Sequence, residues 1–553
     1  MRVRSLVSVL ASEIAAPVAI GLLTAAVLAV ALSAHGQQIF FYDGDSLVLP
    51  LFRQSIAAGQ PMEWVMSSQL FLLPELPLYL LCSAIVGGSV KAALALNAIL
   101  NSVLLYALFR ACAAHIGWPR RWHRIAAPML ASLVFLVFVA LEIRGTQTNG
   151  SVATFTLLTT YYYGATMTAL ALLALALWLT RAFQRTTPVR SPRYGVFAAA
   201  SALLLGVQTV SNPLVLLQFA VPFLGALAFA SLLHVLPWRM TVLLAAPLLA
   251  GGAAGYLARF ALSRYLLPNA GSYVHFSQIP ESLSFFAGVL RTFVSTPLGI
   301  TEAVLLLLLL GAAVATGIRS LREPHRSPSG VVIPVFVIGS VLVTVVGSVL
   351  VGSTATRYLG PVFVFPLLVL LAPALWRRSA KRAHRVMRIT ATVAGAAVLL
   401  ASAMVATPAI ATLTTITAQS ASPGLSCLQR WIGDRNIVGE GSYWASRALD
   451  VYGTGRVDVL QVDSTLGARA WMTNLASFRD RAPSYFIVDA PSRRALAIRL
   501  LGTPSAVIDC GPFQVYDYAG TAGQNRMTVK IASSARYQLT RRGYADPVES
   551  AER

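Results

Sequence analysis

The stretch AAPVAIGLLTAAVLAVALSAHGQQIFFYDGD, from Ala15 to Asp45, joins a mostly apolar segment to a pair of aspartates. The apolar part, Ala15–Ala34, is long enough to cross a bilayer as a helix, so Asp43 and Asp45 follow the point where that helix leaves the membrane. A carboxylate near a bilayer is costly to keep, and the first 411 positions hold only nine acidic residues against 27 basic ones. Asp43 and Asp45 are therefore functional-site candidates. The alternative is that both cap a surface helix.

The composition is that of a membrane protein. Hydrophobic residues make up 56% of the chain and charged residues 12%, with a mean hydropathy of +0.68. Apolar runs of about 17 to 22 residues recur, and in lipid their backbones must hydrogen-bond within helices. We predict a polytopic α-helical membrane domain over residues 1–411 with about eleven transmembrane helices. The predicted spans are Ala15–Ala34, Val90–Phe109, Ile125–Leu141, Gly164–Thr180, Tyr194–Val210, Pro213–Leu233, Met240–Ala258, Ile300–Ile318, Val331–Val351, Tyr358–Leu375 and Ile389–Ile410.

The distribution of charge predicts the orientation. Most of the net charge of +22 lies in short loops between apolar segments, which excludes a nucleic-acid-binding stripe and sets orientation by the positive-inside rule. With Arg2 and Arg4 cytoplasmic, 20 basic residues of the first 411 fall inside and seven outside. The loops 35–89 and 259–299 and the C-terminal domain are then extracytoplasmic. Because long loops in compact domains are usually functional, the outer face is the expected working face.

Two segments leave alternatives in this topology. Leu70–Gly87 is apolar, but Pro74 and Pro77 interrupt it, and we place it at the outer interface. If it crossed the membrane, the basic cluster Arg120–Arg124 would lie outside. The first apolar segment resembles a signal peptide at Ala31–Ala34, but it is longer than a usual signal core, which favours an uncleaved helix.

From residue 422 the composition becomes that of a soluble protein. Strand-like and helix-like segments alternate over residues 422–520, which predicts a small extracytoplasmic α/β domain. Cys427 and Cys510 are its only cysteines, and outside the cytoplasm such a pair favours a disulfide. A metal site is the weaker alternative, since the domain has no His and no CxxC motif. The polar end, 521–553, is expected to be a flexible tail.

Three short motifs follow one another along the membrane domain. The first is Tyr42-Asp43-Gly44-Asp45 after the first helix, and the second is Pro74-Glu75-Leu76-Pro77-Leu78-Tyr79. The third is Thr356-Arg357-Tyr358-Leu359-Gly360-Pro361 at the outer end of a late helix. This order resembles the C-type (GT-C) membrane glycosyltransferases, which use polyprenyl-phosphate sugars. The frequent His-Pro-Pro-Leu of that family is replaced here by Leu73-Pro74-Glu75-Leu76-Pro77, which leaves the subfamily open.

The resemblance implies roles for these residues. Asp43 would be the catalytic carboxylate, with Asp45 as the second candidate, and a carboxylate can take the proton of an acceptor hydroxyl. Arg357 and Tyr358 would hold the donor phosphate, for which an Arg fork is suited. Tyr42 and Glu75 would contact substrate. If a divalent ion such as Mg²⁺ or Mn²⁺ takes part, Asp43 and Asp45 are its ligands, but the sequence requires none.

Other patterns compete with these roles. Arg264 starts a second Arg-Tyr-Leu element and is an alternative phosphate ligand, while Arg357 could simply anchor a helix end. The aromatic run Tyr161–Tyr163 is interpreted as an interfacial belt rather than a sugar platform. His275 is expected to be a loop residue without a catalytic task.

The expected function is therefore an inverting glycosyltransferase in a bacterial-type inner membrane. Its partners would be the bilayer, a polyprenyl-phosphate sugar and a glycan, lipid or protein acceptor, with no nucleic acid. A transporter or flippase of a lipid-linked glycan is the main alternative, although internal repeats are not evident. A glycan-binding envelope scaffold is a further one. The sequence contains no Gly-rich phosphate loop followed by Lys and Ser/Thr, so it does not support an ATP-driven pump.

Overall fold

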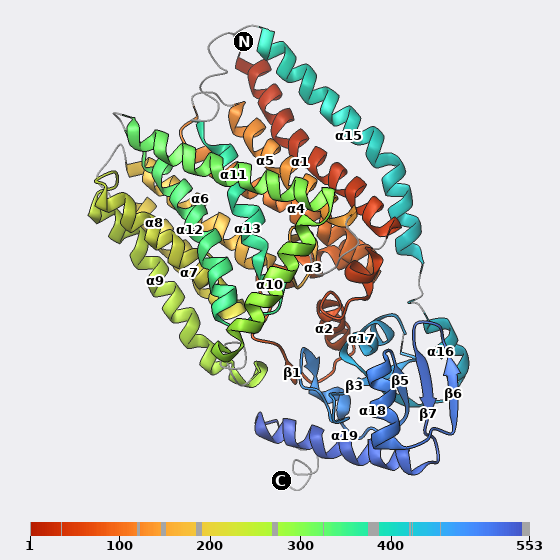
Figure 1. Ribbon diagram of the computed structural model, residues 1–553. Helices are drawn as coiled ribbons and strands as arrows, with labels where there is room; N and C mark the ends of the chain where they lie inside the picture. The colour runs from red at the N-terminus through yellow and green to blue at the C-terminus, as the bar shows by residue number, and fades with distance from the viewer. Residues whose placement is uncertain are drawn as a thin grey trace.

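The computed structural model describes residues 2–34, 36–118, 122–144, 151–183, 191–267, 275–323, 326–373, 386–419, 422, 424–453 and 455–544. A bundle of long helices carries a smaller sheet-containing domain at the end opposite the N-terminus (Figure 1). The basic residues within 119–121, 184–190 and 374–385, on which much of the predicted orientation depends, lie outside the described residues. The orientation therefore stays a prediction.

Nine helices of the described residues are long and apolar enough to cross a membrane. Helices of 20 residues or more reach about 30 Å, the thickness of the hydrocarbon core. This confirms the predicted polytopic α-helical fold class. The nine are α1 (Arg2–Ser33), α4 (Val90–His115), α5 (His123–Arg144), α6 (Tyr163–Phe183), α7 (Pro192–Ser211), α9 (Trp238–Ala261), α11 (Pro297–Arg322), α12 (Pro328–Leu350) and α15 (Val386–Ala418).

The two remaining predicted spans are helical but interrupted. The segment Pro213–Leu233 becomes a short π-helical turn, η4 (Leu216–Ala220), followed by α8 (Val221–Leu232). The segment Tyr358–Leu375 becomes η8 (Thr356–Leu359), α13 (Gly360–Val364) and the 3₁₀ helix η9 (Phe365–Leu371). Proline lacks the N–H that an α-helix requires, and Pro361 and Pro366 are the second residues of α13 and η9. Of the roughly eleven predicted spans, nine are therefore long helices within the described residues, and the other two are these shorter apolar segments.

The connecting segments contain shorter elements. Leu70–Gly87 includes a helix, α3, of only 11 residues, which is too short to cross a bilayer alone. The other short elements are η1 (Gln38–Tyr42), α2 (Val48–Ala57), η3 (Thr154–Leu157), η5 (Ser263–Tyr265), η7 (Phe276–Gln278) and α10 (Ile279–Val294), with α3 spanning Glu75–Ile85.

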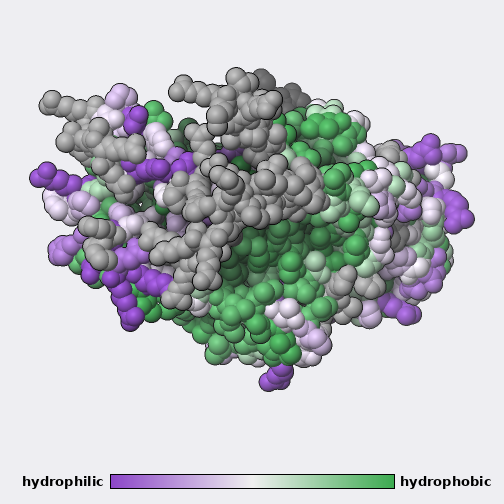
Figure 2. All heavy atoms as spheres, turned by 90° about the horizontal axis from the view of Figure 1, so that it is seen from above, coloured by the Kyte–Doolittle hydropathy of each residue, from purple (hydrophilic) through white to green (hydrophobic). Residues whose placement is uncertain are grey.

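The outside of the bundle is apolar. Seen from the end opposite the C-terminal domain, hydrophobic side chains form a broad surface, with hydrophilic ones gathered toward its edges (Figure 2). On α11, for example, Leu307 and Leu308 are exposed. Helix α6 is the most enclosed of the nine, because 78% of its most apolar 18-residue stretch is buried. The loop that enters α6 is consequently held deep in the protein, and it forms one wall of the candidate site.

The C-terminal domain is a mixed sheet with helices on both faces. Its strand order is β3-β2-β5-β7-β6, with β3, β2 and β5 parallel and β7 antiparallel to its neighbours. Tyr485 and Ile487 of β5 pack with α16 and α17, while Phe486 and Val488 pack with α18 and α19. A parallel strand buried on both faces requires such an apolar run. The bounds are α16 Leu425–Ile432, β2 Val438–Gly441, α17 Tyr443–Tyr452, β3 Asp458–Gln461, β4 Thr473–Asn474, η11 Leu475–Phe478, β5 Pro483–Val488, α18 Pro491–Leu501, β6 Ala506–Asp509, β7 Gln514–Asp517 and α19 Ala522–Arg541.

Two predictions for this domain have different outcomes. The Cys427–Cys510 disulfide is confirmed, with Cα atoms 5.5 Å apart. The prediction of a flexible tail over 521–553 is wrong for most of its length, because α19 is a packed helix. Its buried side chains Met527, Ile531, Ala535 and Leu539 recur every four residues and so form one helical stripe. Residues 545–553 lie outside the described residues.

The first loop of the membrane domain helps to build the C-terminal domain. Strand β1 (Trp64–Val65) pairs antiparallel with β4, and Val65 lies in the core of the C-terminal domain. Next to this pairing, Glu63 accepts two hydrogen bonds from Arg479, at 2.6 and 3.1 Å. The two parts of the chain are therefore joined by shared secondary structure and not by a linker alone.

Candidate active site

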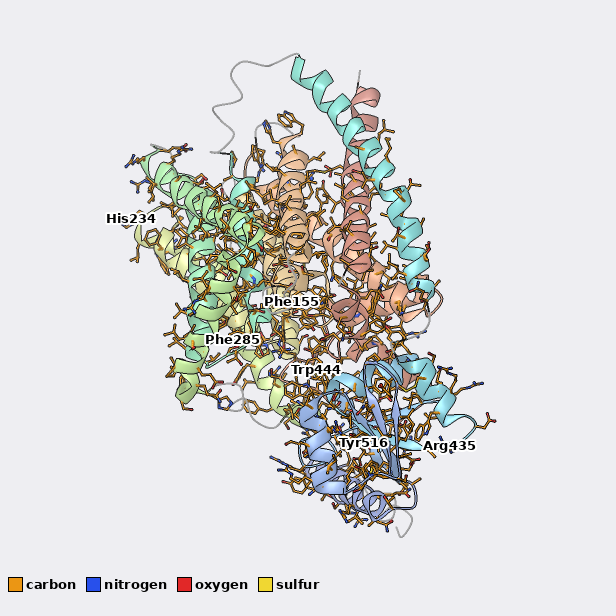
Figure 3. All side chains as sticks on the ribbon, turned by 45° about the vertical axis from the view of Figure 1, so that its right-hand side comes forward. Phe155, His234, Phe285, Arg435, Trp444 and Tyr516 are labelled. Carbon is orange, nitrogen blue, oxygen red and sulfur yellow. A yellow bond between two sulfur atoms is a disulfide. The ribbon has the colours of Figure 1, made fainter. Side chains whose placement is uncertain are left out.

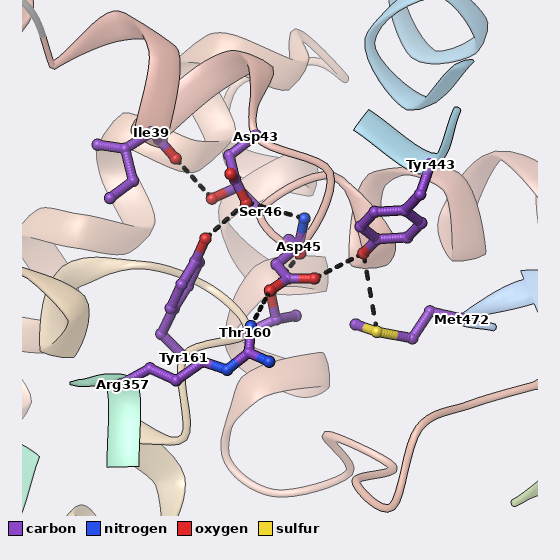
Figure 4. A network of polar contacts seen from close by, with 9 residues as sticks. All are labelled: Ile39, Asp43, Asp45, Ser46, Thr160, Tyr161, Arg357, Tyr443 and Met472. Atoms are coloured by element: carbon purple, nitrogen blue, oxygen red, sulfur yellow. Dashed lines mark hydrogen bonds and ion pairs between the residues drawn. The ribbon is translucent and has the colours of Figure 1, made fainter. Parts of the chain in front are cut away.

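The candidate site begins in the tight loop between η1 and α2. The Asp43 carboxylate accepts from the backbone N–H of Asp45 at 3.0 Å, and the Ser46 hydroxyl donates to the carbonyl of Ile39 at 2.7 Å (Figure 4). Thr159 and Thr160, from the loop before α6, donate to the carbonyls of Ser46 and Asp45. These bonds fix the loop from within and from the neighbouring segment, so its two carboxylates have defined directions.

Asp43 retains a free oxygen. Its Oδ1 accepts from the Tyr161 hydroxyl at 2.5 Å and from the Asp45 backbone, and no described residue hydrogen-bonds its Oδ2. The side chain is half-buried. Burial, and then the negative charge of Asp45, raise the pKa of Asp43 above its ordinary value. A carboxylate of raised pKa with an open oxygen has the properties of a general base.

Asp45 has both oxygens engaged. Arg357 donates from Nη1 to Oδ2 at 2.7 Å, and the Tyr443 hydroxyl donates to Oδ1 at 2.7 Å. The residue is only 5% exposed. Its charge is thus neutralised by one partner from a late membrane segment and oriented by another from the C-terminal domain. Asp45 is better placed to hold neighbouring groups than to take up a proton.

Arg357 keeps donors available for a ligand. Its side chain is 26% accessible, and its Nε, which is buried, has no hydrogen-bond partner among the described residues. The guanidinium lies 5.9 Å from the ring of Tyr162 and 5.8 Å from that of Tyr358, within the range of cation–π contacts. Arg357 is therefore held among Asp45, Tyr162 and Tyr358, and not as a helix anchor in the open interface.

The aromatic run Tyr161–Tyr163 belongs to this site. Tyr161 binds Asp43, Tyr162 packs against Tyr358 at 5.1 Å, and Tyr163 is buried. Tyr162 has a φ of 67°, which a bulky residue rarely adopts and which recurs at functional sites. The interpretation as an interfacial aromatic belt is therefore wrong, because these rings face the protein interior.

Both residues that were proposed to contact substrate, Glu75 and Tyr42, are enclosed by the protein. Glu75, at the start of α3, is 1% exposed and accepts from the backbone of Gly164 at 3.1 Å. Burial raises the pKa of Glu75 to about 8. Tyr42 is also buried, and its hydroxyl accepts from Lys91 at 2.8 Å. The structure places Glu75 behind the tyrosine loop and Tyr42 next to Asp43, so only Tyr42 adjoins the carboxylate pair.

Arg264 lies in a different environment. Its guanidinium packs over Tyr265 at 4.7 Å and over Tyr544 at 6.0 Å. Arg542 of the C-terminal domain donates to the carbonyl of Arg264 at 2.9 Å. The described hydrogen bonds and ring contacts of Arg264 are all with Tyr265, Arg542 and Tyr544. Those of Arg357 are with Asp45, Tyr162 and Tyr358. Of the two Arg-Tyr elements, the structure brings the later one to the aspartates.

Sequence reasoning missed two residues near the carboxylates. Lys91 is buried at the start of α4, where it donates to Tyr42 and to the carbonyl of Gln419. A single Lys in the first turn of an otherwise apolar helix was an available signal, since such a charge is costly. Tyr443 had no comparable signal, because nothing local connects residue 443 to residue 45. Trp444, the next residue, lies at the boundary of the bundle and the C-terminal domain (Figure 3).

The donor set does not favour a metal held by both aspartates. Hard cations need several oxygen ligands, but both oxygens of Asp45 already accept from Arg357 and Tyr443. Across the described part of the chain, no group of three or more His, Cys, Asp or Glu side chains has a metal-binding arrangement.

Comparisons with known proteins show a similarity to a solved structure. No protein-family model matches the chain, and no curated protein matches it at a significant level. The chain is similar to a solved crystal structure, that of ArnT from Cupriavidus metallidurans bound to undecaprenyl phosphate. The TM-score is 0.48 and the sequence identity 13%, over 94% of this chain and 98% of that one.

Proposed function

We propose that this protein is an integral-membrane glycosyltransferase of the C type. It would transfer a sugar from a polyprenyl-phosphate donor to an acceptor on the extracytoplasmic face, with inversion at the anomeric carbon. The motif order Asp43-Gly44-Asp45, Pro74–Tyr79 and Arg357-Tyr358 supports the family. The site geometry supports the reaction independently.

The observation that carries the proposal is that the two neighbouring aspartates have different partners. Asp45 is neutralised by Arg357, while Asp43, beside it, keeps an open oxygen and a raised pKa. Arg357 uses Nη1 for Asp45, while its side chain as a whole remains 26% accessible. A base and an anion-binding donor are thereby presented together, which a sugar transfer from a phosphate leaving group requires.

The proposed step forms one bond and breaks one. An acceptor hydroxyl attacks the anomeric carbon of the donor while Asp43 Oδ2 takes the hydroxyl proton. The bond between that carbon and the phosphate oxygen breaks, and its electron pair leaves with the polyprenyl phosphate. The remaining N–H groups of Arg357 stabilise the charge that develops on the leaving phosphate. Attack opposite the leaving group inverts the configuration at the anomeric carbon.

Three arguments support the placement of this site on the outer face. Tyr443 binds Asp45 directly, so the site and the C-terminal domain must lie on the same side of the membrane. A disulfide joins Cys427 to Cys510, and disulfides persist in oxidising compartments. The positive-inside rule, applied to the sequence, predicts that the same side is the outer one.

Reconstitution tests the proposal. The purified protein is incorporated into liposomes with radiolabelled sugars carried on undecaprenyl phosphate and with acceptors extracted from cell envelopes. We expect label to move to the acceptor and free undecaprenyl phosphate to appear in equal amount. If no donor is consumed while labelled lipid crosses the bilayer, the protein is a flippase and the proposal is wrong.

A further inference from the structure

We infer that Tyr443 of the C-terminal domain is a positioning residue that keeps the Asp45–Arg357 pair monodentate, so that Arg357 retains donors for a phosphate ligand. The inference rests on the proposed function and assigns the C-terminal domain a part in the same site.

Tyr443 reaches the membrane-domain loop from the start of α17. The Ser442 side chain caps this helix by accepting from the N–H of Ala445 at 3.2 Å. The Tyr443 ring is 2% exposed, and its hydroxyl donates to Asp45 Oδ1 at 2.7 Å, while Arg357 approaches the other oxygen (Figure 4). The Asp45 carboxylate therefore accepts one hydrogen bond from the C-terminal domain and one from the late membrane segment.

The ring has little freedom to move. A Cβ atom on Gly44 would stand 2.6 Å from Cε1 of Tyr443, so the loop backbone touches the ring at this point. The guanidinium groups of Arg447 and Arg469 also lie near the ring, 5.3 and 5.7 Å from its centre. Arg447 is itself fixed by Gln461 at 2.6 Å. The hydroxyl is thus preorganised toward Asp45.

This arrangement changes how Arg357 can bind. A guanidinium and a carboxylate commonly form two parallel hydrogen bonds. Here the Tyr443 hydroxyl occupies Oδ1, and Arg357 donates through Nη1 to Oδ2. Without the hydroxyl, the carboxylate could turn to accept twice from Arg357. The donors that a phosphate needs would then be consumed inside the protein.

The first test measures lipid binding to the full-length protein in nanodiscs. Tritium-labelled undecaprenyl phosphate is titrated onto the wild type, Tyr443→Phe and Tyr452→Phe. Tyr452 is a matched control at the other end of α17, because its hydroxyl also crosses the interface and donates to the carbonyl of Phe41 at 2.8 Å. We expect affinity to fall about tenfold in Tyr443→Phe and less than about twofold in Tyr452→Phe.

The second test asks whether Tyr443 acts through Arg357. A lysine presents a point charge and cannot form the two-pronged contact. Adding Tyr443→Phe to Arg357→Lys should therefore weaken binding by less than about twofold further, because coupled residues are not additive. In a transfer assay, Tyr443→Phe should raise the donor KM by about the same tenfold and change kcat by less than about threefold.

Several results would overturn the inference. They are wild-type affinity in Tyr443→Phe, an equal loss in Tyr452→Phe, or a full tenfold loss that persists in the Arg357→Lys background. If Tyr443→Phe does not fold, Gly44→Ala is the second variant, because its Cβ would displace the Tyr443 ring. It should give the same loss of affinity, and unchanged affinity in Gly44→Ala also overturns the inference. Failure of the wild type to bind the lipid or transfer sugar would instead count against the proposed function.

Discussion

Arg357 and Asp45, which are 312 positions apart, are joined by a 2.7 Å hydrogen bond between Nη1 and Oδ2. The pair neutralises the more buried of the two aspartates and leaves Asp43 as the carboxylate with an open oxygen. It also links the first external loop to the late Arg-Tyr element, which the sequence places at opposite ends of the membrane domain. The predictions for catalysis follow from this asymmetry.

Asp43→Asn should abolish most of the transfer activity. The substitution keeps the shape of the side chain but removes the proton acceptor, and general bases typically contribute about 10²–10⁴-fold in rate. The measurement is sugar transfer by the reconstituted protein under single-turnover conditions. Asp434→Asn, at an exposed position of the C-terminal domain, is the control and should be unaffected. Retained transfer in Asp43→Asn would show that another group is the base.

The rate should rise with pH through the pKa of Asp43. Burial and the charge of Asp45 raise that pKa above 3.8, and only the deprotonated form can accept a proton. Activity is therefore lost as pH falls through the raised pKa. Asp45→Asn removes the neighbouring negative charge, so in that variant the inflection of kcat/KM against pH should move to lower pH. An inflection that stays in place would rule out Asp43 as its source.

Arg357→Lys should impair use of the donor. A lysine cannot reproduce the planar set of donors that a phosphate accepts from arginine, so we expect kcat/KM for the donor to fall about 10–100-fold. Arg264→Lys is the matched control, because that side chain packs on Tyr265 and Tyr544 instead. Equal losses in both variants would contradict the assignment of the phosphate site to Arg357.

A chelator should leave transfer unchanged within about twofold, since a divalent ion shared by the two aspartates would have to compete with the hydrogen bonds that Arg357 and Tyr443 donate to Asp45. Transfer is measured in EDTA and again after addition of Mg²⁺ or Mn²⁺. If activity disappears in EDTA and returns with either ion, the hydrogen bonds of Asp45 must rearrange in the working enzyme.

The disulfide should stabilise the C-terminal domain. It closes a sequence separation of 83 residues, for which the chain-entropy model gives about 4–5 kcal/mol in the free energy of unfolding. We expect Cys427→Ser/Cys510→Ser to lower the denaturant midpoint of the domain, followed by its tryptophan fluorescence. In intact, non-reduced cells both thiols should resist alkylation. Alkylation there would contradict the bond and the extracytoplasmic placement together.

Local patterns carried much of the fold but little of the site. The alternation of strand-like and helix-like segments predicts the α/β domain that contains α17, because such spacing of apolar residues is a local property. The contact of Tyr443 with Asp45 depends on tertiary packing, which no spacing encodes. The run Tyr161–Tyr163 was misread since aromatic residues at a membrane interface and in a buried site share the same local pattern. Helix α19 was missed because its polar composition concealed a narrow apolar stripe.

The pairing of β1 with β4 has a consequence for how the protein is made. Trp64 and Val65 leave the ribosome long before Thr473 and Asn474, their partners in the sheet. The loop that carries Asp43 is held near its final position by that pairing, by Glu63 with Arg479, and by Tyr443. It can therefore reach its final form only after the last membrane helix has been inserted and the C-terminal domain translated. Until then a newly made chain lacks the contacts of Tyr443 and Arg479 with this loop, so the candidate site is assembled late in synthesis.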